Sequence, residues 1–202
     1  MNINARDFIQ IWQKFSEDIA KQEELNVKIH EWREVIVGNV TLKDYPLADY
    51  IRKNYQRLAR HVSGYNGVAL SMTAQGNFSK LSALGSEQKQ NKDAFTPVGL
   101  DILLEHEEEL DKSFEQMQKL VNRKAKLKVL ITYHLPSAED LKARIAENFQ
   151  KIIQQANDVF PENPATEYLL IIGQPEGEKM TWFFYVYQLQ SSVFYTKYQP
   201  IT

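Results

Sequence analysis

The sequence contains no cysteine, and this absence removes two kinds of chemistry. Disulfides and thiolate metal sites are excluded, and with four histidines any metal site must be ligated mainly by oxygen. A dominant charge is also missing, because 24 Lys and Arg stand against 26 Asp and Glu for a net charge of −2. A protein that coats nucleic acid without specificity is therefore not expected, although a local basic groove stays open.

Long apolar runs are absent too, since none reaches the roughly 20 residues that cross a bilayer. The N-terminal residues show no basic region followed by an apolar core, so we expect a cytoplasmic protein without a membrane partner. No P-loop, dinucleotide-binding glycine motif, zinc spacing or serine–histidine–acid arrangement is present. The length of 202 residues and 43% hydrophobic content predict one domain, with an N-terminal helical region (1–61) and an α/β core (62–202).

The N-terminal quarter carries the apolar spacing of amphipathic helices. Apolar residues three and four apart predict a helix over 5–25, on the stripe Phe8, Ile11, Trp12, Phe15 and Ile19. A second helix is expected over 26–37, and Pro46 favours the first turn of a third. These helices precede every predicted strand.

The rest of the chain alternates strands with helices. A hairpin is expected from 68–72 and 78–84, followed by strands at 99–107, 127–133, 168–172 and 181–187, with helices at 108–123 and from 137. This order predicts an α/β fold with a mixed central sheet flanked by helices. The tail, 193–198, fits an edge strand or a partner-binding arm.

An acidic pair ends the first strand of the predicted β-α-β unit. Glu105 and Glu107 are two residues apart, so they should point the same way at the mouth of the sheet. Two carboxylates on one face repel, and a cation or a proton relieves that repulsion. His106 should point to the other face as a hydrogen-bonded structural residue, and Asp101 should occupy a surface position where the strand begins.

A hairpin strand, an acid-x-acid strand, a helix and the strand Leu-Lys-Val-Leu-Ile-Thr-Tyr (127–133) together resemble the core of the PD-(D/E)xK, or restriction-endonuclease-like, superfamily. The resemblance covers roughly residues 62–190 and is architectural. It implies a restriction-endonuclease-like fold and a Mg²⁺-dependent DNA phosphodiesterase, or a descendant that has lost catalysis.

The resemblance also implies a set of site residues. Glu105 and Glu107 match the acidic pair that would hold Mg²⁺ (or Mn²⁺) in that superfamily, and Lys119 could replace its lysine. The strand before them offers Asn66 where an aspartate is expected. A neutral amide oxygen binds a divalent cation more weakly than a carboxylate, so Asn66 distinguishes this chain from an ordinary member.

Two alternatives stay open. Glu105 and Glu107 could be a solvated strand end that leads into the positive end of the next helix. The chain could also be a non-catalytic interaction protein, such as a toxin-neutralising or phage-related adaptor, that uses its helical arm or the aromatic segment from Trp182 to Tyr198. A homodimer is compatible with this alternative.

Overall fold

The computed structural model describes residues 3–36, 46–62, 68–71, 78–80, 100–107, 110–134, 139–176, 179–190 and 193–198. The helices are α1 (Ala5–Ala20), α2 (Glu23–Ile36), α3 (Pro46–Lys53), α4 (Tyr55–His61), α5 (Leu110–Val121) and α6 (Glu139–Val159). The strands are β1 (Val68–Ser71), β2 (Phe78–Lys80), β3 (Leu100–His106), β4 (Ala125–Tyr133), β5 (Glu167–Glu176), β6 (Lys179–Gln188) and β7 (Val193–Tyr198).

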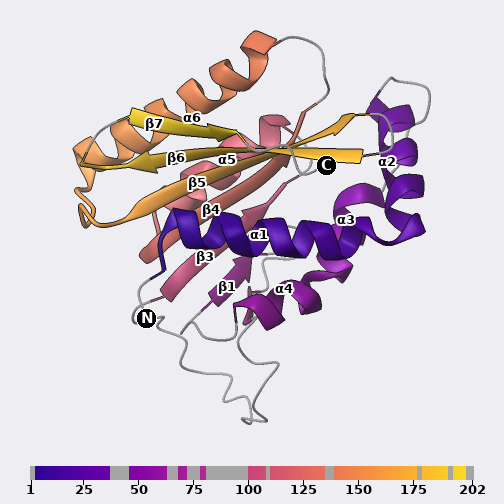
Figure 1. Cartoon of the computed structure of the whole chain (residues 1–202). Coiled ribbons are helices and arrows are strands. Elements are labelled where there is room, and N and C mark those ends of the chain that lie inside the picture. Colours follow the sequence, from indigo (N-terminus) through magenta and orange to yellow (C-terminus); the bar gives the residue numbers. More distant parts are fainter. Residues whose placement is uncertain are drawn as a thin grey trace.

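The strands form one seven-stranded mixed sheet in the order β2-β1-β3-β4-β5-β6-β7 (Figure 1). Strands β1, β3, β4 and β5 are parallel, whereas β2, β6 and β7 pair antiparallel to their neighbours. The predicted α/β class and the β3-α5-β4 unit are therefore confirmed. The tail is a strand, and it lies at one edge of the sheet.

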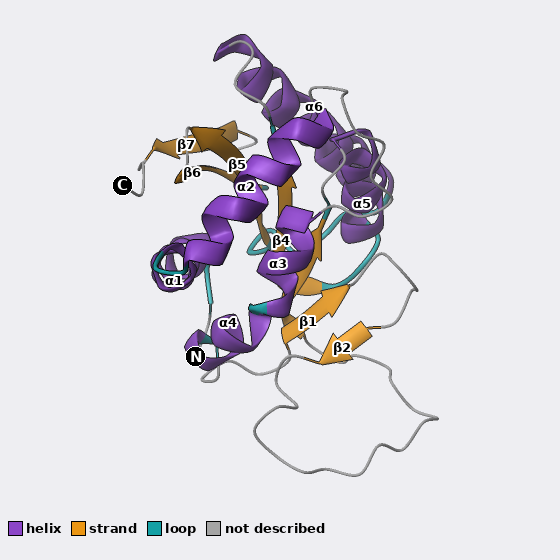
Figure 2. Cartoon of the chain, turned by 90° about the vertical axis from the view of Figure 1, so that its right-hand side faces the viewer, coloured by secondary structure: helices purple, strands orange, loops and turns teal. Residues whose placement is uncertain are grey.

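Helices cover both faces of the sheet, as Figure 2 shows. Alternation along β3 divides the core between them: Ile102 and Leu104 pack with α1 to α4, whereas Leu103 packs with α5 and α6. Along β4, Val129 and Ile131 join the first cluster and Leu130 joins the second. Each central strand is thus apolar on both sides, which explains the uninterrupted hydrophobic runs in the sequence.

The N-terminal helices differ from expectation at two places, because the third predicted helix is divided at Asn54 into α3 and α4, and the first is divided as well. Helix α1 ends at Ala20 and α2 begins at Glu23, so the predicted helix over 5–25 is divided in two. The start of α1 is fixed by a capping box, in which the Asp7 amide donates to Asn4 Oδ1 at 2.9 Å and the Asn4 amide donates to Asp7 Oδ2 at 3.4 Å.

The N-terminal region is part of the core. Phe8, Trp12 and Phe15 of α1 are each 0% exposed and pack in the same cluster as strands β3 to β6. The side chain of Glu167, at the start of β5, accepts a hydrogen bond from the Ala5 amide at 2.6 Å. These helices are therefore a layer of the fold and not a projecting arm. None of the described helices has the length and apolar character to span a membrane.

Candidate functional site

The predicted acidic pair lies at the end of β3 and is buried. Glu105 is 0% exposed and Glu107 is 5% exposed, although an open position at the mouth of the sheet was expected. The physical reason is that α5 packs over this face beside Leu103. The Glu107 amide donates to the Ile131 carbonyl at 2.9 Å, which extends the pairing between β3 and β4 by one residue.

Side-chain cations face the acidic groups of β3. Arg123 Nη1 lies 4.0 Å from Glu105 Oε1, a distance that allows electrostatic attraction but exceeds a hydrogen bond. Lys126 Nζ contacts Asp101 Oδ1 at 2.8 Å. Asp101 is 4% exposed, so the predicted surface position is wrong, because Lys126 on the adjacent strand β4 contacts its carboxylate. Arg123 thus offsets part of the negative charge of Glu105, and Lys126 offsets that of Asp101.

Outside β3, the described part of the chain includes one further residue of the predicted site, Lys119. Lys119 is exposed in the last turn of α5, where its Nζ donates to Gln116 Oε1 at 3.1 Å. Asn66 lies outside the described residues. In the strand that follows it, Ser71 is the residue level with Glu105. Over the described ranges, no three His, Asp or Glu side chains are placed to hold a metal ion.

His106 lies on the opposite face from Glu105, as expected, and is hydrogen-bonded. Its Nδ1 is 2.5 Å from Tyr55 Oη and its Nε2 is 2.8 Å from Tyr133 Oη. All three side chains are at most 4% exposed. Helix α4, β3 and β4 each contribute one of these side chains. The two hydrogen bonds therefore join the N-terminal helical layer to the sheet.

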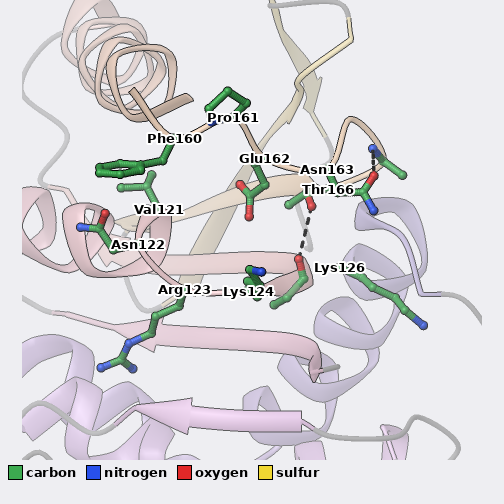
Figure 3. Close-up of a pocket in the computed structure, with 12 residues that line it drawn as sticks. Val121, Asn122, Arg123, Lys124, Lys126, Phe160, Pro161, Glu162, Asn163 and Thr166 are labelled. Carbon is green, nitrogen blue, oxygen red and sulfur yellow. Dashed lines mark hydrogen bonds between the residues drawn. The ribbon is translucent and has the colours of Figure 1, made fainter. Parts of the chain in front are cut away.

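A pocket of about 720 Å³ opens at the N-terminal ends of the central strands β4 and β5. Two turns form it: one joins α5 to β4 and the other joins α6 to β5 (Figure 3). We call it the cationic pocket; its lining residues are Val121, Asn122, Arg123, Lys124, Ala125, Lys126, Phe160, Pro161, Glu162, Asn163, Ala165 and Thr166. In Figure 3, Glu162 is near the centre, while Arg123 and Lys126 extend in opposite directions.

One exposed aromatic side chain belongs to this pocket. Phe160 is 74% exposed, the highest exposure among the large hydrophobic residues described. Its turn is held by local hydrogen bonds, because the Phe160 amide donates to the Ala156 carbonyl at 2.8 Å and the Glu162 amide donates to Asn157 Oδ1 at 2.9 Å. The Phe160 ring is thus available to a ligand on an anchored turn.

A buried ionic network underlies the pocket. Lys128 is 0% exposed on β4, and its Nζ contacts Glu162 Oε1 at 2.5 Å and Tyr168 Oη at 3.3 Å. The Tyr168 hydroxyl donates to the other oxygen of Glu162. Glu162 retains 15% side-chain exposure, so this carboxylate links the buried network to the pocket.

Burial perturbs both partners of Glu162. Desolvation lowers the pKa of Lys128 below its ordinary 10.5, and the neighbouring Glu162 opposes that shift. Desolvation also raises the pKa of the Tyr168 phenol, and the Glu162 carboxylate raises it further because a phenolate would be repelled. The phenol is therefore held protonated, as a hydrogen-bond donor to Glu162.

The sequence carried a signal for part of this site. Lys126 and Lys128 alternate along β4, so they point to one face, and Lys128 stands within the buried part of the strand. A lysine inside such a strand predicts a buried anionic partner. No comparable signal identifies Glu162, which lies in a turn 34 positions later.

Comparisons of the chain with protein-family models, curated proteins and solved structures find no match.

Proposed function

We propose that this protein binds nucleic acid in the cationic pocket. The observation that carries the proposal is the combination of Arg123 and Lys124 with the exposed ring of Phe160 around one cavity of about 720 Å³. Cationic side chains attract backbone phosphates, and an exposed aromatic ring stacks on a base. The volume falls within the range that holds a ligand of nucleotide size. DNA is the polymer that the sequence resemblance favours.

The charge distribution limits the size of the contact. The charge of Lys126 is partly neutralised by Asp101, and that of Arg123 by Glu105. Lys124 therefore supplies the least compensated positive charge of the pocket. Glu162 adds a negative charge that Lys128 opposes from below. Because the whole chain has a net charge of −2, binding should rest on this patch and involve few phosphates. The salt dependence should therefore be shallow, with a slope of about −1 to −2 in log K against log salt.

Fluorescence anisotropy of labelled single-stranded and duplex DNA, at two salt concentrations, tests the proposal. Phe160→Ala should weaken binding of single strands roughly tenfold, because base stacking contributes about 1–3 kcal/mol. Lys124→Glu should weaken binding of both forms and reduce the salt dependence. Val159→Ala is the matched apolar control, since Val159 is 68% exposed one residue earlier and does not line the pocket.

Lys14→Glu on α1 is the matched charge control, because Lys14 is exposed and lies outside the pocket. Equal losses from pocket and control variants would show non-specific attraction and contradict the proposal. Absence of binding by the wild-type protein at low salt would contradict it outright.

Metal-dependent cleavage of the bound DNA is a second candidate. It is favoured by Arg123, which lines the cationic pocket and also lies 4.0 Å from Glu105. A phosphate bound by Arg123 would thus approach the acidic strand. Among the described residues, Glu105 and Glu107 alone are an incomplete ligand set for Mg²⁺ or Mn²⁺, and a restriction-endonuclease-like site would need Asn66 as well. Lys119 would have to act from the far end of α5.

Incubation of plasmid and oligonucleotide DNA with the protein and Mg²⁺ or Mn²⁺ tests this second candidate. Cleavage that Glu105→Gln and Glu107→Gln abolish would support it. DNA that stays intact with either metal, under conditions where anisotropy detects binding, would leave a nuclease-like binding protein without catalysis.

A protein partner, including a second copy of this chain, has one structural argument in its favour. Strand β7 lies at the sheet edge, where strand addition can join two chains. Trp182 and Tyr187 of the aromatic segment are buried in the core and offer no surface. Light scattering after size-exclusion chromatography would reveal a dimer, and a monomer at all concentrations would exclude self-association.

A further inference from the structure

A second cavity, of about 420 Å³, lies on the other side of the sheet from α5 and α6. It is formed where α1 ends, α2 begins and β6 begins, and we call it the α1–α2 cavity. Figure 1 shows how α1 and α2 are arranged beside the sheet. Its apolar wall is made by Ile19, Leu25, Met180 and Trp182, each at most 7% exposed. The volume and the apolar wall suit a short aliphatic chain or a single ring.

Ser16 gives this cavity a specific polar group. The residue is 4% exposed and lines the cavity, and within the described ranges its hydroxyl has no hydrogen-bond partner. A buried hydroxyl without a partner lowers stability, so such a group in a native fold calls for an explanation. A ligand oxygen that accepts the Ser16 hydrogen bond would supply one.

The mouth of the cavity favours an anion. Lys21 and Lys179 are exposed lining residues, and Glu17 is the acidic group among them. Lys21 also lies 3.8 Å from Asp18, which does not line the cavity. Because Asp18 compensates Lys21, the attraction for an anion comes mainly from Lys179. A ligand with an apolar body and one carboxylate would place each part against a complementary surface.

We infer that the α1–α2 cavity is a binding site for a small apolar monocarboxylate, of the size of a medium-chain fatty acid. The apolar body lies against Met180 and Trp182, and the carboxylate accepts from the Ser16 hydroxyl and is attracted by the entrance lysines. This inference is independent of nucleic-acid binding, because the two cavities share no residue.

Isothermal titration calorimetry of the full chain with octanoate tests the inference. Saturable binding of one octanoate per chain is expected, together with weaker or no binding of octylamine, whose charge is opposite. Ala20→Trp, at an exposed lining position at the end of α1, should fill the cavity and abolish binding while the fold, checked by circular dichroism, is retained.

Ser16→Ala separates a ligand-binding role from a structural one. It should reduce octanoate affinity roughly tenfold through the lost charge-assisted hydrogen bond, but it should not lower the melting temperature, because the free hydroxyl makes no bond to lose. Lys179→Glu should reduce affinity, whereas Lys14→Glu and the pocket variant Lys124→Glu should leave it unchanged. No saturable binding, or wild-type affinity in Ala20→Trp, would overturn the inference.

Discussion

Two adjacent residues of β3 face opposite layers of this protein and are stabilised in different ways. His106 faces the N-terminal helices and is held by hydrogen bonds to the hydroxyls of Tyr55 and Tyr133. Glu105 faces α5 and meets the guanidinium of Arg123 at 4.0 Å. Both side chains are at most 1% exposed, so burial alone does not explain the difference.

The surroundings of the two faces do explain it. Around His106, aromatic rings contact one another in a closed series with centroid distances of 5.1–6.1 Å: Trp12, Phe15, Tyr55, His106, Tyr133 and Trp182. The opposite face contains Asp101, Glu105 and Lys128, and its compensating groups reach the cationic pocket. We call the face of the aromatic rings the neutral face and the opposite one the charged face; the charged face connects the core to a solvent-accessible site.

The largest effect is expected from removing a fully buried cation of the charged face. Lys128→Ala should lower the free energy of unfolding by about 3 kcal/mol, since it leaves Glu162 without its cation. The value lies at the low end for buried pairs because Glu162 keeps 15% exposure. Urea unfolding measures the change, with Lys124→Ala as an exposed control expected within about 0.5 kcal/mol. Equal losses in the free energy of unfolding from the two substitutions would show that the buried Lys128 network does not stabilise the fold more than an exposed lysine does.

The neutral face should respond almost as strongly at His106. His106→Ala removes two hydrogen bonds and should lower the free energy of unfolding by roughly 2–3 kcal/mol, because two buried phenols lose a partner. A triple variant, His106→Leu with Tyr55→Phe and Tyr133→Phe, should recover part of that loss, since the two hydroxyls that lost His106 are then removed as well. A triple variant less stable than His106→Ala would contradict this explanation.

A smaller effect tests how tightly the aromatic rings pack. The Cβ of Gly173→Ala would lie 2.7 Å from Trp182 Cζ3 and 2.8 Å from Tyr133 Cδ1, which is closer than carbon atoms can approach. Relief requires both rings to shift, so we expect a loss of about 1–3 kcal/mol in urea unfolding. Near-UV circular dichroism should change as well. An unchanged spectrum with full stability would show that the neutral face is not rigid.

The smallest expected effect is a dependence of stability on pH that arises from Tyr168 and Lys128 on the charged face. Because the pKa of Tyr168 is raised from 10.0 in the folded protein, the unfolded chain loses that proton first, and stability should fall as pH rises above 10.0. The lowered pKa of Lys128 has the opposite sign, so its contribution to stability rises as pH approaches 10.5. Tyr168→Phe should show a smaller decline above pH 10 than wild type in urea unfolding.

Tyr50, whose pKa burial also raises, is common to both proteins and should cancel in this comparison. Parallel curves for wild type and Tyr168→Phe between pH 9 and 11 would contradict the link between Tyr168 and the charged network.

Local sequence patterns were sufficient for much of the fold. The apolar periodicity of the α1 segment and the continuous runs in β4 and β5 depend on neighbouring residues, so the class, the strand order along the chain and the β3-α5-β4 unit were predictable. The boundary between α1 and α2 was not, because helical spacing continues across residues 21 and 22 and only tertiary packing selects the break.

The candidate site was predictable only in part. The basic residues before β4 were visible, but the charged groups that meet are far apart in sequence: Glu162 joins Lys128, and Asp101 joins Lys126. Which acid meets which base depends on parallel register and on how the two turns close over the strand ends. Exposure of Phe160 depends on the same geometry.

Glu105 and His106 show which properties of a residue the sequence determines and which the tertiary structure determines. Period-two alternation in a strand determined, from the sequence by itself, that these neighbours would face opposite layers. What each one meets was decided by the tertiary structure, because α5 covers one face and the N-terminal helices cover the other. Side-chain direction is a local property of the backbone, whereas burial and pairing depend on segments that only folding brings together.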